Sequence, residues 1–178
     1  YSFYAYLSRM RYITRWGLMR NSVSENIQEH SHQVAVLAHA LALISRELFD
    51  NKTIDPDRCA TAALFHDAGE IITGDMPTPV KYYNSEIQEA YKDVEKIAEY
   101  KLLNELPQDI RAAYESIFKA SDDESEQYMR RLVKAADKIS ALIKCIEEEK
   151  SGNSEFHTAY KTIHASVETM MDEMPEVK

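Results

Sequence analysis

One short segment carries most of the information on fold and chemistry, and it reads Ala62-Ala63-Leu64-Phe65-His66-Asp67-Ala68-Gly69-Glu70. Its first half is small and mostly apolar, as expected for a buried helix. Glu70 follows Asp67 by three residues and His66 by four, so on a helix all three side chains project towards one side. Burying two carboxylates with an imidazole is costly unless a positive charge compensates them, and a divalent cation would do so. Taken alone, however, a His-Asp pair is more often structural than functional.

Apolar residues recur at helical spacing along almost the whole chain, and no run alternates as a strand does. Asn26 with Glu29 resembles a capping box, and Asp55-Pro56 forms a cap with a first turn. The prolines of residues 75–80 exclude a helix there and predict a stiff loop. We therefore expect an all-α fold, a compact single-domain helical bundle with helices at about 3–14, 26–49, 56–73 (closed by Gly74), 85–106, 107–118, 122–149 and 154–174.

The composition is that of an ordinary soluble domain, with 178 residues of which 44% are apolar and 29% charged. A formal net charge of −9 would repel a polyanion. It argues against a protein that binds along nucleic acid polymers and against a basic membrane anchor. Residues 1–24 nevertheless carry arginines and no carboxylate, which leaves open either a small anionic ligand or a solvated basic helix face.

The chain also lacks the apolar segments that mark membrane insertion or secretion. Its longest apolar stretch, residues 34–44, is shorter than a membrane span, and the N-terminus has no apolar signal region. Cys59 and Cys145 are far apart and are predicted to be small core residues in a reducing compartment. We expect a cytoplasmic protein. Because residue 1 is not Met, we also expect the sequence to start inside the natural gene product.

Two further residues carry metal-ligand chemistry on other predicted helices. His30 lies in the first turn of one helix, and Asp137 lies mid-helix beside two alanines, where an Asp lowers helix propensity. A surface carboxylate paired with a neighbouring lysine is the alternative for Asp137. With His66 and Asp67 these residues offer two imidazoles and two carboxylates, a suitable set for Mn, Co, Fe, Ni or Zn. Four ligands leave room for water and a substrate oxygen, as metal catalysis requires.

The order H…HD…D resembles that of the HD-domain metal-dependent phosphohydrolases. The chain is more closely similar to the bacterial HD-domain 5'-deoxynucleotidases, the YfbR-like group. The loop from Gly74 to Lys81, with sequence Gly-Asp-Met-Pro-Thr-Pro-Val-Lys, is far more specific than H…HD…D. The resemblance spans nearly the whole chain and is carried by residues 7–9, 15–16, 25–26, 29–31, 66–70, 73–82, 134–137 and 142–153.

The resemblance implies a single HD domain over residues 1–178, with the metal-binding core at about 26–145. An N-terminal helix would supply substrate residues, and a C-terminal helix would pack on the core. One divalent cation, Co or Mn or otherwise Fe, Ni, Cu or Zn, is implied, with ligands His30, His66, Asp67 and Asp137. Implied substrate contacts are Arg15, Trp16, His30, Asp67, Asp75, Met76, Pro77, Thr78 and Asp137. The family is cytoplasmic and homodimeric, and acts on deoxyribonucleoside 5'-monophosphates rather than on nucleic acid or membranes.

Chemical roles follow from the side chains themselves. Glu70 is our candidate for the general base, and a plain helix-surface carboxylate is the alternative. Arg15 offers a planar charged fork for a phosphate, unless it is an ordinary surface arginine. Trp16 is the one Trp of the chain, and a tryptophan is more often a core residue than a ligand contact. Beside Arg15, however, it can pack on the sugar and exclude a 2'-hydroxyl. Asp75 is a candidate acceptor for the 3'-hydroxyl, and we expect broad base preference.

The sequence departs from the family pattern in two places. His32 stands where some members have an apolar residue, and its position two residues after His30 directs it away from a metal. The segment after His164 is shorter than in longer members, which bears on any dimer contact. Two alternatives remain open: hydrolysis of another nucleotide, either a phosphodiester or a guanosine polyphosphate, and a nucleotide-sensing protein without turnover. A sensor predicts loss of a ligand or of Glu70, and none is lost.

Overall fold

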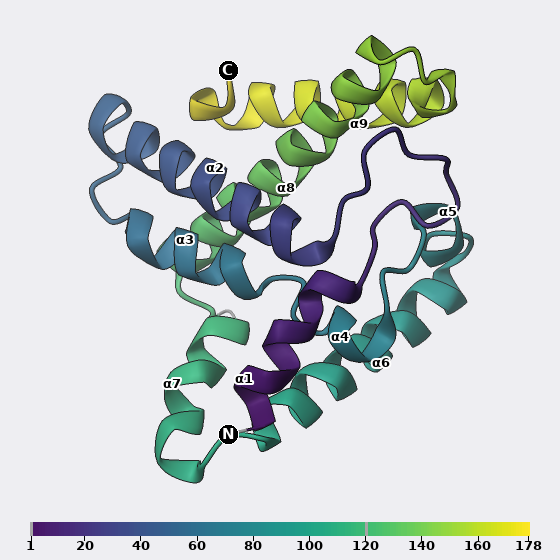
Figure 1. The fold of residues 1–178 in the computed structure, drawn as a ribbon. Helices are drawn as coiled ribbons and strands as arrows, with labels where there is room; N and C mark the ends of the chain where they lie inside the picture. The colour runs from purple at the N-terminus through teal and green to yellow at the C-terminus, as the bar shows by residue number, and fades with distance from the viewer. Residues whose placement is uncertain (1, 120) are drawn as a thin grey trace.

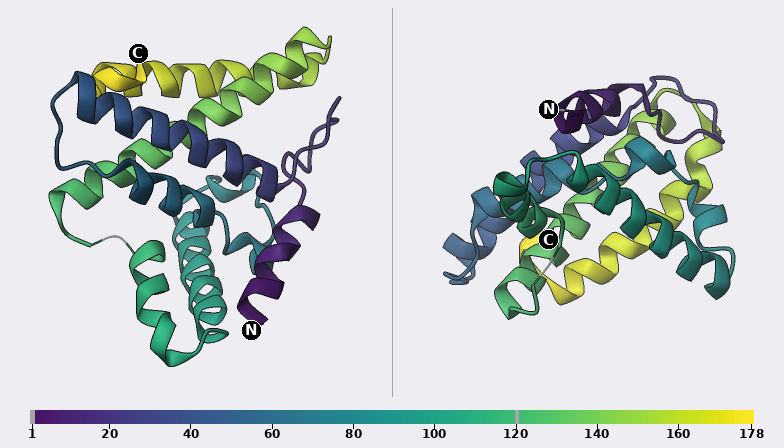
Figure 2. Two further views of the ribbon diagram at one scale, coloured as in Figure 1. Left: turned by 60° about the vertical axis from the view of Figure 1, so that its left-hand side comes forward. Right: turned by 90° about the horizontal axis from the view of Figure 1, so that it is seen from below.

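The computed structural model of the protein describes residues 2–119 and 121–178, and these residues are mainly helical, as predicted. The upper layer in Figure 1 contains the helices α2 (Ile27–Leu48), α3 (Pro56–Phe65), α8 (Glu124–Lys150) and α9 (His157–Glu173). The lower part contains α1 (Ser2–Leu7), α6 (Ser85–Asn104) and α7 (Gln108–Phe118). The two termini lie at opposite ends of the molecule (Figure 2). Among the described residues, no helix is long and apolar enough to cross a membrane.

The predicted caps fix the starts of the helices that carry the site. Asn26 accepts hydrogen bonds from the backbone N–H groups of Gln28 and Glu29, both at 3.0 Å, and so begins α2. Asp55 caps α3 in the same way. Such caps are worth about 1 kcal/mol each because they satisfy N–H groups that have no partner within the helix.

Two apolar clusters stabilise the fold, one in each part of the molecule. The larger one joins α2, α3, α8 and α9 through fully buried side chains such as Val34 and Leu132. The smaller one joins α1, α6 and α7 and includes Phe3 and Leu102. Ala68 belongs to the smaller cluster, whereas Ala63, five residues earlier, belongs to the larger one. The His-Asp stretch therefore crosses from one cluster to the other.

The prediction of one helix from 56 to 73 is wrong, because α3 ends at Phe65. Residues 66–69 form turns, and a short helix α4 (Glu70–Thr73) follows. The carbonyl oxygen of Ala63 is contacted by the backbone N–H of His66 at 3.4 Å and by the Nδ1 of the same ring at 2.7 Å. These contacts replace the i to i+4 bond that would continue an α-helix. Gly74, with φ of 74°, ends α4 as expected.

Two other predicted boundaries also differ. The first helix does not run to residue 14, since α1 is followed by a 3₁₀ helix, η1 (Ser8–Tyr12), and then by an isolated bridge between Thr14 and Asn26. The loop at 75–80 is shorter than predicted, because a one-turn helix, α5 (Thr78–Lys81), begins inside it. Pro79 fits there because the first turn of a helix needs no N–H donor. The chain ends with η2 (Ser154–Phe156), α9 and η3 (Pro175–Val177).

Candidate active site

Three separate segments bring the predicted metal ligands together. His30 is supplied by α2, Asp137 by α8, and His66 and Asp67 by the turn after α3. One ligand atom from each of His30, His66 and Asp137 lies within 4.8 Å of the others. The Oδ2 of Asp67 lies 3.2 Å from the Nε2 of His66 and 3.6 Å from the Nε2 of His30. Ligands of one ion at about 2.1 Å lie roughly 3–3.5 Å apart, so this spacing suits a shared cation.

The hydrogen bonds of the buried His30 ring fix its tautomer. Ser140 Oγ donates to the Oε1 of Gln33 at 2.6 Å, which leaves the lone pairs of the hydroxyl oxygen free to accept. His30 Nδ1, 3.1 Å from the same Oγ, is therefore the donor in that contact. In the neutral ring the Nε2 then carries a lone pair, and it faces the Oδ1 of Asp137 at 3.0 Å.

His66 is oriented in the same sense. Its Nδ1 donates to the carbonyl oxygen of Ala63 at 2.7 Å, so in the neutral ring its Nε2 also presents a lone pair. This buried Nε2 has no hydrogen-bond partner among the described residues, although Asp67 Oδ2 is only 3.2 Å away. Both rings thus direct unprotonated nitrogens at carboxylate oxygens.

Such an arrangement of facing acceptors is repulsive unless a proton or a cation lies between them. Two imidazole nitrogens and two carboxylates form a donor set that suits a first-row divalent ion or Zn. The Nδ1–H groups are held by a hydroxyl and a backbone carbonyl, which is how metal-binding histidines are usually oriented. The residues present therefore fit the cation that the sequence predicted.

The charges of the centre shift several pKa values. Burial alone would raise the pKa of Asp137, but when a proton rather than a cation lies between Asp137 and His30, that hydrogen bond and the nearby His66 ring outweigh burial and hold the pKa well below its ordinary value. For Asp67, burial is likewise outweighed by His66 and Arg15, and the pKa is lowered. For His66, the Asp67 carboxylate outweighs burial and raises the pKa above 6.5. Both carboxylates are consequently ionised at neutral pH.

Glu70 lies beside this centre, and its pKa is shifted in the direction opposite to those of Asp67 and Asp137. Its Oε2 is buried and has no hydrogen-bond partner among the described residues. Burial, followed by the charges of Asp67 and Asp75, raises the pKa of Glu70 to about 9, against the opposing influence of Arg15 and Lys81. A carboxylate with a raised pKa beside a cluster of metal ligands is typical of a proton-transfer group.

Arg15 and Trp16 lie on the segment between η1 and α2. Arg15 Nε donates to Glu25 Oε2 at 3.1 Å, and its Nη1 donates to Asp67 Oδ2 at 3.3 Å. Trp16 Nε1 donates to the same Glu25 oxygen at 2.8 Å. The indole packs on the ring of Phe156, with centroids 5.2 Å apart. Arg15 thus reaches the centre directly, whereas Trp16 lies beside it.

The loop after α4 adjoins this segment. Asp75 Oδ2 accepts from the backbone N–H of Trp16 at 3.3 Å, and burial raises the pKa of Asp75. Met76 and Pro77 are half-buried, and Thr78 is exposed at the start of α5. The structure therefore joins the two predicted substrate segments through one contact.

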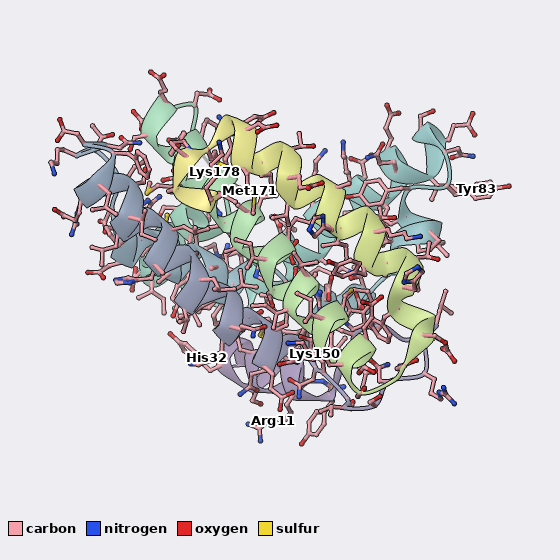
Figure 3. All side chains as sticks on the ribbon, turned by 90° about the horizontal axis from the view of Figure 1, so that it is seen from above. Arg11, His32, Tyr83, Lys150, Met171 and Lys178 are labelled. Carbon is pink, nitrogen blue, oxygen red and sulfur yellow. The ribbon has the colours of Figure 1, made fainter. Side chains whose placement is uncertain are left out.

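A separate pocket of about 230 Å³ opens onto the same centre between α3, α6, α7 and α8. His66 and Asp137 line it, together with Lys134 and Glu99. The predicted substrate residues at 15–16 and 75–78 do not line this pocket. His32 takes no part in the centre: it is exposed on α2 and points away from the molecule (Figure 3).

Three residues of the site were not assigned a role from the sequence. Gln33 and Ser140 orient His30, and each lies three residues after a predicted ligand, on the same helix face. That spacing is a signal that could have identified them. Glu25 lies in a stretch that carries the family resemblance, but only its contacts in the fold show what it binds.

Comparison with known proteins agrees with this geometry. A family model described as 5'-deoxynucleotidase YfbR-like matches residues 2–178. The chain belongs to the YfbR-like 5'-deoxynucleotidase family. The 5'-deoxynucleotidase of Shewanella oneidensis is 46% identical over 166 residues, which cover 93% of this chain and 84% of that protein. The 5'-deoxynucleotidase YfbR of Escherichia coli is 45% identical over 166 residues, covering 93% and 82%.

Solved structures place this YfbR-like chain among HD-domain proteins. An HD-domain phosphohydrolase from Listeria innocua superposes with a TM-score of 0.83 at 23% identity, covering 99% of this chain and 82% of that one. The HD phosphohydrolase DatZ of cyanophage S-2L, bound to dA and one catalytic Zn²⁺, gives a TM-score of 0.55 at 25% identity, covering 79% and 69%. The predicted HD-domain fold and family are confirmed.

Proposed function

We propose that this protein is a metal-dependent 5'-deoxynucleotidase that hydrolyses deoxyribonucleoside 5'-monophosphates to deoxyribonucleosides and phosphate. The observation that carries the proposal is the set of acceptor atoms from His30, His66, Asp67 and Asp137 that face one another within the centre. Membership of the YfbR-like family and the names of the relatives support this substrate class. The Zn²⁺ and dA of DatZ support a metal-dependent site for a deoxynucleoside.

The four ligands would hold one divalent cation, which supplies a Lewis acid that neutralises phosphate charge and lowers the pKa of a water molecule. Arg15 binds the phosphate through the guanidinium that already reaches Asp67. The positive charge of the cation would oppose the rise in the Glu70 pKa, so that in the loaded site the ionised Glu70 accepts a proton from the attacking water at its unpaired Oε2. The water oxygen forms a bond to phosphorus, the bond from phosphorus to O5' breaks, and O5' leaves as the nucleoside hydroxyl with the proton that Glu70 took from the water.

Selection of the sugar is assigned to Trp16 and Asp75. The indole occupies the space beside the 2' position and excludes a hydroxyl there, and Asp75 accepts a hydrogen bond from the 3'-hydroxyl. The contact between the Trp16 backbone and Asp75 supports a common position for the two residues. Met76, Pro77 and Thr78 would complete the substrate loop, and we infer broad base preference.

Further properties belong to the same proposal. We infer that Co or Mn, or otherwise Fe, Ni, Cu or Zn, serves as the cation, since the nitrogen and oxygen ligands suit all of them.

We also propose one HD domain over residues 1–178 with its metal-binding core at about 26–145, and a cytoplasmic homodimer. The free, buried cysteines Cys59 and Cys145 support a reducing compartment. Light scattering after gel filtration tests the dimer.

Phosphate release from a panel of deoxy- and ribonucleoside 5'-monophosphates is the test. We expect hydrolysis of the deoxynucleotides, loss of that activity after exhaustive chelation, and recovery on addition of Mn²⁺, Co²⁺ or Zn²⁺. Activity that survives chelation would refute the metal-dependent reaction. Hydrolysis of phosphodiesters or guanosine polyphosphates in place of deoxynucleoside monophosphates would refute the substrate class.

A further inference from the structure

One carboxylate oxygen connects the two residues that we assign to phosphate and sugar. Glu25 Oε2 accepts from Trp16 Nε1 at 2.8 Å and from Arg15 Nε at 3.1 Å. Consecutive side chains of an extended segment point to opposite faces and do not normally reach one acceptor. Here they do, because Trp16 has a φ of 62° and its backbone turns sharply. The oxygen thus fixes the guanidinium and the indole relative to each other.

The unusual backbone of Trp16 requires support from its surroundings. A positive φ is an outlier for a bulky residue and costs about 1–3 kcal/mol. The backbone N–H of Trp16 donates to Asp75, its carbonyl oxygen accepts from Met19 N at 2.9 Å, and its indole donates to Glu25. Of these contacts, the one with Glu25 alone holds the indole by a polar bond, since Phe156 contributes only apolar packing.

Glu25 adjoins the helix that supplies a metal ligand, and its Oε1 lies 3.9 Å from His30 Nδ1. Its backbone carbonyl accepts from Arg15 N at 2.9 Å, and the next residue, Asn26, caps α2, the helix that supplies His30. The Glu25 side chain is only 14% exposed and that of Arg15 13%, so their ion pair is largely shielded from water. An ion pair in this setting holds its geometry more strictly than a surface pair.

We propose that Glu25 is the positioning residue that sets the preference for deoxyribose over ribose, by fixing Trp16 against the sugar while it aligns Arg15 with the phosphate. This inference rests on the proposed function and extends it to a residue outside the metal ligands and substrate contacts. Without the shared oxygen, the indole can rotate and the space beside the 2' position opens.

The test compares Glu25→Gln with Glu29→Gln. The first variant removes the carboxylate at nearly constant shape. The second removes an exposed carboxylate from the first turn of α2, four residues further along the chain, and is the matched control. In Glu25→Gln we expect the ratio of kcat/KM for deoxy to ribo substrates to fall roughly tenfold to hundredfold, as for a lost hydrogen bond to a charged group. KM for deoxynucleotides should rise, and the control should match the wild type.

Intrinsic fluorescence gives a second readout, because Trp16 is the one Trp of the chain. We expect Glu25→Gln to shift its emission and to increase quenching by acrylamide, with an unchanged affinity for Mn²⁺. A wild-type substrate ratio together with wild-type emission in Glu25→Gln would overturn the proposal. An equal fall in activity on both sugars, parallel to a loss of Mn²⁺ affinity, would overturn it as well. If the wild type hydrolyses no deoxynucleotide, the proposed function fails, and the emission still tests the contact with Glu25.

Discussion

Helix α8 carries two polar clusters that differ in how completely the chain satisfies them. Near its C-terminal end, Glu148 is 2% exposed and pairs with Lys144. It also accepts from the side chain of Asn153 at 2.8 Å and from the backbone N–H of Ser22 at 2.9 Å. Three turns earlier, Asp137 belongs to the cluster in which acceptors face acceptors.

The difference separates a structural cluster from a functional one. Every oxygen of Glu148 has donors from within the chain, so that cluster is complete as folded. At the other cluster, His66 Nε2 and Glu70 Oε2 are buried without hydrogen-bond partners among the described residues. Unsatisfied buried polar atoms are costly and call for an explanation, and two of them gather here beside the predicted metal ligands, where a bound ion or a catalytic role supplies one.

The largest effect is expected from Glu70→Gln, which keeps the shape of the side chain and removes its basicity. We expect turnover of deoxynucleotides to fall by about 10²–10⁴, the usual contribution of a general base, while binding of metal and nucleotide persists. Steady-state kinetics and calorimetric titration measure the two quantities. Glu89→Gln, an exposed carboxylate on α6, is the control. Turnover at the wild-type rate in Glu70→Gln would remove the assigned role.

The second effect concerns stability at the satisfied cluster. Glu148→Ala leaves Lys144 buried without its partner, so we expect a loss of about 3–5 kcal/mol in the free energy of unfolding. For a domain of this size the corresponding fall in Tm is roughly 6–20 °C. Urea unfolding checks it, with the exposed neighbour Glu147→Ala as control. Equal losses of unfolding free energy in the two variants would contradict the assignment of Glu148 to a cluster that stabilises the fold.

The third effect concerns the orientation of His30. Ser140→Ala removes the acceptor of the Nδ1–H, and we expect the affinity for Mn²⁺ or Co²⁺ to fall about 10- to 100-fold, as for other residues that orient metal ligands. Metal titration of the variant measures it. Because the hydroxyl also donates to Gln33, Gln33→Ala should weaken metal binding in the same direction. Unchanged affinity in both variants would show that the tautomer is fixed by other means.

The two clusters are also expected to show opposite pH dependences of stability. Although burial opposes it, the hydrogen bonds from Lys144 and Asn153 hold the pKa of Glu148 well below its ordinary 4.5. Its contribution to stability is therefore present above pH 4.5 and is lost as the pH falls below that value. Each proton taken up changes stability by about 1.4 kcal/mol per pH unit. Between pH 6 and pH 3, Glu148→Gln should lose less free energy of unfolding than the wild type does. Urea unfolding at each pH measures this difference.

For Glu70 the sign is reversed in the metal-free protein. Burial raises its pKa to about 9, so the folded state holds a proton that the unfolded state releases near pH 4.5. The contribution is complete below pH 4.5 and is lost as the pH rises towards 9. Glu70→Gln should remove this alkaline loss when stability is measured in chelator. A slope that persists in the variant would assign it to another group.

Much of the site could be predicted from the sequence because its residues carry chemistry of their own. His30, His66, Asp67 and Asp137 were predictable as a set from residue type and order, and Asn26 and Asp55 marked their helices by cap chemistry. The local backbone was not predictable in the same way. The turn at residues 66–69 follows from the His66 ring bonding to Ala63, a side-chain contact that periodicity does not register. The shared bond of Arg15 and Trp16 to Glu25 depends on the positive φ of Trp16. Sequence patterns lead one to expect that backbone conformation at glycine and not at tryptophan.

The crossing of the His66–Gly69 turn between the two apolar clusters has a mechanical consequence. His30 and Asp137 belong to helices of the larger cluster, whereas the turn that supplies His66 and Asp67 leads to Ala68 in the smaller one. A cation shared by all four residues would therefore bind to both parts of the molecule at once and link the two apolar clusters. Removal of the cation is therefore expected to lower the stability of the contact between these two parts of the molecule.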